Sequence, residues 1–330
     1  MSMRSGRTPR YARNTRLEGL LEELSGLLAP AEKAALDLAP SSEKPTVLVV
    51  GAPRSGTTLM TQWLAASGAF AYPTNMLSRF FMAPAVGARI QQLLTDPRFA
   101  HGDELAGFAD QVDFQSNLGK TKGPLAPNEF WYFWRRFLPT VDIERIGERI
   151  NEVDFDGLRQ SLAAMAAVFE KPLMMKGMML QYDLGAFAER LPNTLFIHVE
   201  RDAPANVRSL LDARERFFGD TSSWYSAKPP EYEALVGLPP VNQVAGQVVH
   251  TNRHIAQALD SLPFHRSLHV QYEEFCQDPT TTWSKLAERM CAFDEAIPAS
   301  HPDTTPFRAT RRAEPDADGP IENALRTLNA

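Results

Sequence analysis

The residues with the clearest chemical potential form a short glycine-rich segment, which reads GAPRSGTT over positions 51–58. It follows the apolar run TVLVV and precedes the apolar stretch LMTQWL. Gly51 and Gly56 allow backbone angles that point several N–H groups to one side, and a helix that starts directly after the turn adds unpaired N–H groups. Further donors to anionic oxygens come from one arginine and three hydroxyl side chains: Arg54, Ser55, Thr57 and Thr58. The segment predicts a cradle for phosphate or a similar anion.

The glycine spacing is that of the nucleotide-triphosphatase loop, G-x-x-x-x-G-K-[ST], but Thr57 takes the place of the lysine. Because that lysine is the usual partner of the β- and γ-phosphates, its replacement argues against a nucleotide kinase or triphosphatase. A strand–turn–helix with two glycines is often only a tight connection. The full string after a buried strand is a stronger indication of anion binding.

A second candidate anion site follows the apolar run LFIHV, which ends at Val199. Arg201 comes two residues later, and Ser209 lies eight residues beyond it on an expected helix. An arginine at the carboxyl end of a strand and a serine on the next helix can converge on one phosphate. The alternative is that Arg201 pairs with a neighbouring acidic side chain. Arg308, in the basic run FRATRR, is a third candidate, with a solvated charge run as its alternative.

Together these segments resemble the sulfotransferase family. The string PRSGTT resembles the family's 5′-phosphosulfate loop, and GxPRSGTTLM is similar to the branch with protein-tyrosine sulfotransferases and many bacterial members. Arg201 and Ser209 match the family's 3′-phosphate element, although the usual proline two places after the arginine is Ala203 here. The residues that would hold the 5′-phosphate and sulfate are Arg54, Ser55, Gly56, Thr57 and Thr58.

The resemblance implies a co-substrate, 3′-phosphoadenosine 5′-phosphosulfate, with adenosine 3′,5′-bisphosphate as the product. It implies in-line transfer of a sulfuryl group to a hydroxyl or amine, with no metal required, and a basic C-terminal loop, represented by Arg308, that closes the 3′-phosphate pocket. The acceptor stays open among small-molecule, glycan, lipid and peptide classes. A P-loop kinase or triphosphatase and a non-catalytic sulfonucleotide-binding protein are the alternatives.

Lys176 follows the apolar run LMM at the expected carboxyl end of a strand, where ligands gather in doubly wound sheets. By the resemblance it contacts the sulfate near the bridging oxygen; a snorkelling surface lysine is the alternative. A base must also take the acceptor proton. Tyrosine sulfotransferases place a glutamate 21 residues after the loop arginine, but here that residue is Asn75.

Two other residues are candidates for this base. Glu129 lies in the aromatic stretch PNEFWYFW, and such surroundings can raise the pKa of a carboxyl group. His101 is the second choice because imidazole titrates near neutrality. Either side chain could equally be structural.

Several elements must position these residues. Four apolar runs predict buried strands, at 46–50, 173–175, 195–199 and 268–272. Helical spacing predicts helices at 17–38, 158–169, 184–191, 205–218 and 244–262. This alternation predicts an α/β fold, a three-layer P-loop-like parallel sheet flanked by helices. Residues 17–330 are expected to form one domain, with an aromatic-rich cap or acceptor-binding insertion at about 70–154, after a flexible basic arm at 1–16. We expect a long loop at 224–240.

Composition limits the remaining classes of function. The net charge of −6 argues against a general nucleic-acid binder. No run approaches the roughly 18 apolar residues of a membrane span, and the N-terminus lacks a secretory core, so the cytosol is the expected compartment. Cys276 and Cys291 suggest packed thiols. His250 and His254 have helical spacing, but no glutamate follows His250, so we expect no metal site.

Overall fold

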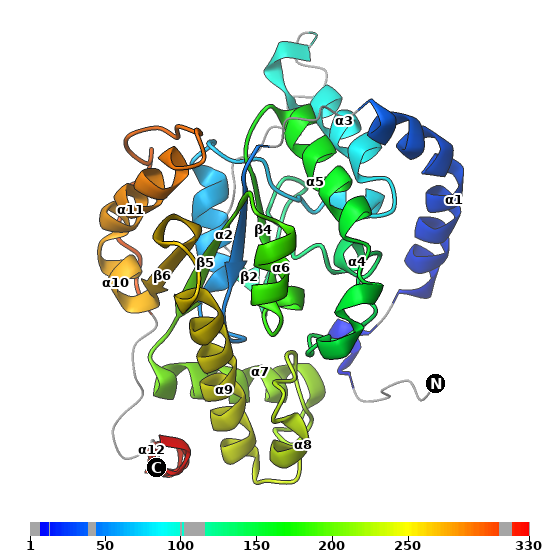
Figure 1. Ribbon diagram of the computed structural model, residues 1–330. Coiled ribbons are helices and arrows are strands. Elements are labelled where there is room, and N and C mark those ends of the chain that lie inside the picture. The colour runs from blue at the N-terminus through cyan, green and yellow to red at the C-terminus, as the bar shows by residue number, and fades with distance from the viewer. Residues whose placement is uncertain are drawn as a thin grey trace.

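A four-stranded parallel sheet organises the computed structural model, which describes residues 7–12, 14–38, 44–99, 101, 116–309 and 319–329 (Figure 1). The strand order is β4-β1-β5-β6, and every neighbouring pair is parallel. The strands are β1 (Thr46–Val50), β4 (Leu173–Lys176), β5 (Thr194–Glu200) and β6 (Ser267–Gln271). Each agrees with a predicted run to within one residue at either end. The predicted α/β class is confirmed.

Strand β1 lies at the centre of the sheet, and all five of its residues are buried. Val47 and Val49 face one apolar cluster, while Leu48 and Val50 face another. A strand covered on both faces needs apolar side chains at successive positions, which is why its sequence shows no alternation. Each such side chain contributes about 1.5–3 kcal/mol by burial.

Helices cover both faces of the sheet, as Figure 1 shows. On the side of Val47 the apolar cluster takes residues from α2 (Thr57–Ala66), α10 (Tyr272–Gln277) and α11 (Pro279–Cys291). On the side of Leu48 it takes residues from α5 (Phe155–Phe169), α6 (Leu184–Arg190) and α9 (Pro240–Asp260). The three layers of the prediction are therefore present.

The remaining helices pack around this central unit, and some of them add residues to its apolar clusters. They are α1 (Thr15–Asp37), α3 (Pro84–Thr95), α4 (Trp131–Trp134), α7 (Ala203–Phe218), α8 (Tyr232–Leu235) and α12 (Gly319–Asn329). The 3₁₀ turns are η1 (Pro9–Tyr11), η2 (Leu77–Phe80), η3 (Pro97–Phe99), η5 (Gly147–Glu152), η6 (Met178–Leu180) and η7 (Phe264–Arg266). Helix α8 corrects the prediction of an uninterrupted loop at 224–240.

The segment 70–154, expected to form a cap, also supplies much of the core. Its aromatic residues Phe130, Phe133 and Trp134 are almost fully buried in the cluster that includes Leu48. Because the N–H of the Trp134 indole donates to the Lys176 carbonyl at 3.0 Å, this stretch is tied to the end of β4. The same segment carries a hairpin of β2 (Ser116–Asn117) and β3 (Lys120–Thr121).

The N-terminal segment differs from the expectation of a flexible arm at 1–16. Residues 1–6 and 13 lie outside the described part, but residues 7–12 pack on α7. Tyr11 is 6% exposed and stacks on Phe217 at 4.8 Å, and the Thr8 N–H donates to the Phe217 carbonyl at 3.0 Å. Helix α1 begins at Thr15, where the Asn14 side chain accepts the Leu17 N–H as an N-cap. The packing of this segment depends on Tyr11, which the interpretation of residues 1–16 by their arginine spacing did not take into account.

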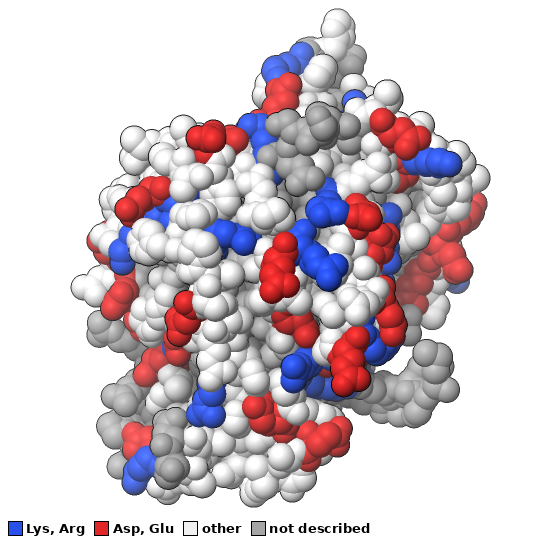
Figure 2. All heavy atoms as spheres, viewed as in Figure 1, with Lys and Arg blue, Asp and Glu red and all other residues white. Residues whose placement is uncertain are grey.

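The charged side chains of the described residues do not form one large patch of a single sign on the face shown in Figure 2. Acidic and basic side chains intermingle there. Among the described residues, no helix combines the length and apolar character needed to cross a bilayer.

Candidate active site

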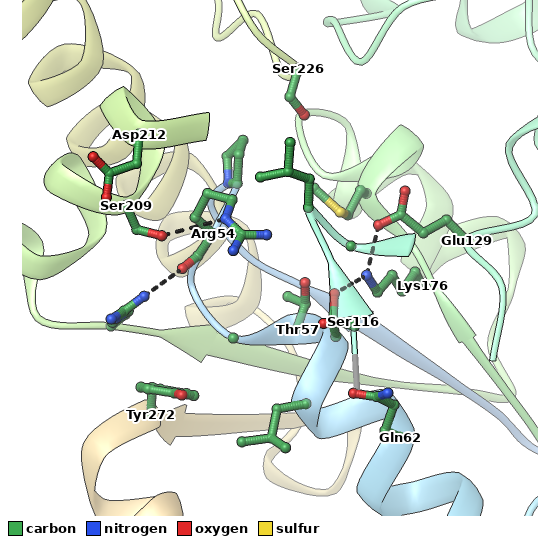
Figure 3. Close-up of a pocket in the computed structure, with 18 of the residues that line it drawn as sticks. Arg54, Thr57, Gln62, Ser116, Glu129, Lys176, Ser209, Asp212, Ser226 and Tyr272 are labelled. Carbon is green, nitrogen blue, oxygen red and sulfur yellow. Dashed lines mark hydrogen bonds and ion pairs between the residues drawn. The ribbon is translucent and has the colours of Figure 1, made fainter. Parts of the chain in front are cut away.

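The carboxyl ends of β1, β4 and β5 open into one cavity of about 550 Å³. In open parallel sheets this edge is where ligands bind. Most of the predicted site residues line the cavity: Arg54, Gly56, Thr57, Thr58, Glu129, Lys176, Arg201, Ser209 and Arg308. Figure 3 shows five of them converging on the cavity from the glycine-rich segment, the end of β4, the segment before α4 and helix α7: Arg54, Thr57, Lys176, Glu129 and Ser209.

The glycine-rich segment makes a tight turn between β1 and α2. Gly56 has a φ of 107°, which non-glycine residues rarely adopt, and a Cβ there would lie 2.2 Å from Cδ2 of Tyr272. Helix α2 begins at the next residue, so the N–H groups of its first turn are directed to the cavity edge. The turn is held from outside, because the Asn206 amide donates to the Pro53 carbonyl at 2.7 Å. This arrangement can bind an anion at the helix N-terminus.

Ser55 has a different position from the other predicted residues of the glycine-rich segment. Its side chain is completely buried and does not line the cavity. The Ser55 N–H donates to the Ala52 carbonyl at 3.1 Å, and this turn directs the hydroxyl beneath the loop toward Gly51. A Cβ on Gly51 would lie only 2.6 Å from that oxygen. The Ser55 hydroxyl therefore lies beneath the loop, whereas the Thr57 and Thr58 side chains line the cavity.

The second predicted anion site adjoins the first. Arg201, directly after β5, donates from Nη1 to the Arg54 carbonyl at 3.2 Å, and Arg54 Nε lies 3.4 Å from Ser209 Oγ. Arg201 also lies over the ring of Tyr272, at 5.2 Å from its centroid. Burial lowers the pKa of the Arg54 guanidinium, and the positive charge of Arg201 lowers it further. An anion placed between two such cations relieves their repulsion.

Lys176 and Glu129 form the most closely connected group at the other side of the cavity. Lys176 Nζ lies 2.7 Å from Glu129 Oε1 and 2.8 Å from Thr58 Oγ1. The lysine is 5% exposed, so it is not a snorkelling surface residue. Glu129 also accepts a hydrogen bond from the indole N–H of Trp131, and its side chain is 27% exposed. Glu129 is thus ion-paired, in contrast to the apolar surroundings expected from sequence.

The other predicted residues have different positions. Arg308 is exposed at the cavity wall; beside it Phe307 donates its N–H to the Cys276 carbonyl at 2.8 Å. His101 is exposed and does not line the cavity, although residues 100 and 102–115 beside it lie outside the described part. Asn75 is not among the lining residues, and its amide donates to the Gly123 carbonyl at 2.8 Å. Asn75 therefore holds a turn.

Sequence reasoning missed several lining residues. Arg208 and Asp212 are four residues apart on α7, and both line the cavity. Asp212 is three residues after Ser209, so helical spacing could have identified it. Tyr225 and Ser226 come from the predicted loop after α7, where no local signal marks them. Burial raises the pKa of the Tyr225 hydroxyl to about 12, with Glu129 as the next cause, so this phenol is neutral at pH 7. Gln62, one turn after Thr58 on α2, completes the floor.

A parallel sheet with a glycine-rich loop and converging cations at its carboxyl edge defines an α/β protein with a cavity that suits an anionic ligand. A model of the sulfotransferase family matches residues 45–292, and the chain belongs to this family.

Solved structures add fold-level support. The crystal structure of sulfotransferase STF9 from Mycobacterium avium is 18% identical, with a TM-score of 0.54, over 98% of this chain and 78% of that one. Sulfotransferase STF1 from Mycobacterium tuberculosis is 15% identical, with a TM-score of 0.49, over 92% and 76%. No curated protein sequence matches the chain significantly. The first of these structures shares the fold.

Proposed function

We propose that the protein transfers a sulfuryl group from 3′-phosphoadenosine 5′-phosphosulfate to a hydroxyl or amine acceptor. The observation that carries this proposal is that one cavity joins the glycine-rich loop to the Arg201–Ser209 pair. A donor with phosphate groups at both its 3′ and 5′ positions needs two anion sites at a fixed separation. A nucleotide without the 3′-phosphate has no use for the second site.

Each anionic group of the donor has its own ligands in this proposal. The 5′-phosphosulfate lies against the N-terminus of α2, with Thr57 and Thr58 as hydroxyl donors and Arg54 as a cation. The 3′-phosphate lies against Arg201 and Ser209, and Arg308 approaches from the C-terminal segment. These cations compensate the phosphate charge within an otherwise acidic chain.

The transfer step follows from the Lys176–Glu129 pair. The acceptor oxygen or nitrogen forms a bond to sulfur in line with the breaking bond between sulfur and the bridging oxygen. Glu129 takes the acceptor proton, and the electron pair of the broken bond stays on adenosine 3′,5′-bisphosphate. Lys176 stabilises the charge that develops on the bridging oxygen. A transferring sulfuryl group carries less negative charge than a phosphoryl group, so side-chain cations suffice without a metal ion.

The position of Thr58 supports this assignment. Its hydroxyl lies 2.8 Å from Lys176 Nζ. Thr58, in the first turn of α2, therefore connects the helix N-terminus to the Lys176–Glu129 ion pair. An anion at the helix N-terminus is thereby brought next to both the lysine and the proposed base. The Trp131 indole, which donates to Glu129, restricts the carboxylate to this side of the cavity.

A binding experiment tests the donor assignment. Calorimetry should detect adenosine 3′,5′-bisphosphate binding in buffer with EDTA, and Arg54→Ala and Arg201→Ala should each weaken it by about 10- to 100-fold, as expected for a lost charge-assisted contact. Arg159→Ala is the matched control, because Arg159 is a surface arginine outside the cavity. Tighter binding of ATP with Mg²⁺ than of the bisphosphate would contradict the proposal.

Transfer is tested separately, with ³⁵S-labelled donor and a panel of phenols, sugars, lipids and peptides. Label should pass to at least one of these acceptors and disappear with Arg54→Ala. Tight bisphosphate binding without transfer to any class would instead identify a sulfonucleotide-binding protein.

A further inference from the structure

Outside the catalytic cavity, three side chains with metal-ligating groups meet between the outer two strands of the sheet. His198 and Glu200 lie two residues apart on β5, so both point to the same face. His269 on β6 is the register partner of His198. One ligand atom from each of the three lies within 4.8 Å of the other two, and none of the three lines the cavity.

The three side chains differ in solvent exposure: one is buried in the core and the other two are accessible to solvent. His198 is 1% exposed, whereas the side chains of Glu200 and His269 are 38% and 56% exposed. An ion arriving from solvent therefore meets two accessible ligands and one that packing holds in place.

The surroundings of the cluster also suit a cation. The Asn252 side-chain oxygen lies 3.3 Å from His198 Nε2, and metal-binding imidazoles commonly have such an acceptor on their other nitrogen. His269 is hydrogen-bonded to Glu200 at 2.8 Å, and the carboxylates of Glu274 and Asp260 also act electrostatically on this imidazole. These three acidic side chains favour a cation at the cluster.

We propose that His198, Glu200 and His269 bind one divalent transition metal ion, with Zn²⁺ as the best match. Two imidazoles and a carboxylate are an established zinc donor set, with water as a fourth ligand. Tetrahedral zinc separates such ligand atoms by about 3.3 Å, so small side-chain rotations bring the three into place. No local sequence motif marks this set, because its residues come from two different strands.

The ion links β5 to β6 directly before Arg201. Because Glu200 is the last residue of β5, coordination fixes the strand end from which Arg201 enters the cavity. The site lies outside the cavity and takes no part in the transfer step. It is also independent of the identity of the sulfuryl donor.

The test uses the full chain after removal of metals with a chelator. Zn²⁺ is titrated in competition with a chromophoric chelator, and Co²⁺ is bound in parallel because its visible spectrum reports tetrahedral coordination. We expect one ion per chain and a higher melting temperature with zinc. His269→Ala should weaken zinc binding by at least about 100-fold, and Glu200→Gln by at least about 10-fold. Both residues are partly exposed, so their variants should keep the wild-type circular dichroism spectrum.

A second histidine group provides the control. His254 Nε2 lies 2.9 Å from Glu231 Oε1 on the far side of α9, and His250 Nδ1 lies 3.4 Å from the same oxygen. His254→Ala should leave zinc affinity within about 2-fold of the wild type, since it removes no proposed ligand. Loss of zinc binding in His254→Ala but not in His269→Ala would overturn the assignment. The absence of stoichiometric zinc binding by the wild type would overturn it as well.

Discussion

Lys176 and Glu129 come from distant parts of the chain and share one ion pair at the cavity. Burying an ammonium group costs several kcal/mol unless it is paired, and Glu129 with Thr58 offsets that cost here. The same ion pair holds the proposed base, Glu129, next to the ammonium group of Lys176, and both groups keep their charges. An anion that binds at the helix start can then share the lysine while the carboxylate faces the acceptor.

The lysine is tested by Lys176→Met, which keeps the length of the side chain and removes its charge. We expect turnover to fall by about 10²–10³-fold because charge on the bridging oxygen is no longer stabilised. Binding of adenosine 3′,5′-bisphosphate, which has no sulfate, should change by less than about 5-fold. Lys33→Met, on the exposed surface of α1, serves as the control. Wild-type turnover by Lys176→Met would refute the assigned role.

The base is tested by Glu129→Gln, which keeps the shape and the acceptor for Trp131. Turnover should fall by about 10²–10⁴-fold, because the amide of glutamine cannot take the acceptor proton. The kcat of the variant and of the wild type, at the same pH, is the measurement. Glu233→Gln, on the exposed side of α8, is the matched control. If Glu129→Gln retains full activity, another group takes the proton.

At the scale of elements, the turn from β1 to α2 depends on one glycine. Gly56→Ala would place a Cβ against the Tyr272 ring in a backbone conformation unfavourable to alanine. We expect the free energy of unfolding to fall by about 1–3 kcal/mol, together with a loss of nucleotide affinity. Gly185→Ala is the control, since no heavy atom lies within 4 Å of its added Cβ. Urea denaturation and calorimetry measure the two effects, and unchanged nucleotide affinity would contradict this role of the turn.

The N-terminal segment 7–12 holds the β2–β3 hairpin beside the cavity. The Tyr11 hydroxyl lies 3.4 Å from Asn117 Oδ1, and Lys120 Nζ lies 5.4 Å from the centre of the Tyr11 ring. The hairpin in turn places Leu118 and Gly119 in the cavity wall. The segment 7–12 therefore supports the part of the cavity wall that the hairpin forms.

Removal of the Tyr11 ring should loosen this hairpin. In Tyr11→Ala we expect faster amide hydrogen exchange at residues 116–121 and a KM for the donor raised by about 2- to 10-fold, with kcat less affected. Phe264→Ala removes an exposed ring far from the hairpin and should change neither quantity. Unaltered exchange in Tyr11→Ala would show that the contact does not order the hairpin.

The elements differ in how far sequence could predict them. The strands were predictable because burial on both faces demands a local run of apolar residues, as in β1 and β5. The positions of Arg201 and Lys176 followed from their places at strand ends. The ion pair with Glu129 and the docking of Tyr11 could not be predicted, because they depend on contacts between distant segments. The direction of the Ser55 hydroxyl, which points beneath the loop toward Gly51, depends on the backbone angles of the turn, and the residues PRSGTT alone do not specify these.

At the scale of the whole molecule, a chain with a net charge of −6 gathers basic residues around one cavity. The lining includes four arginines and one lysine: Arg54, Arg201, Arg208, Arg308 and Lys176. Opposing charges come from Glu129 and Asp212. Such a local surplus attracts an anionic ligand to an otherwise acidic surface. The basic residues come from three separate regions, namely the loop after β1, the unit from β4 to α7, and the C-terminal segment.

A ligand that contacts all three regions should stabilise the fold as a whole. At a concentration 100 times its Kd, adenosine 3′,5′-bisphosphate should add about 2.7 kcal/mol to the free energy of unfolding, since it binds only the folded chain. Differential scanning calorimetry should show this as a rise of a few degrees in Tm that weakens with added salt. Adenosine 5′-monophosphate, which lacks the 3′-phosphate, should give a smaller rise at the same concentration. Because Arg201→Ala removes one of the proposed partners of that phosphate, the difference between the two ligands should become smaller in this variant, while Ser209 and Arg308 keep part of it. An undiminished difference between the ligands in Arg201→Ala would place the 3′-phosphate elsewhere and separate the glycine-rich loop from the second anion site.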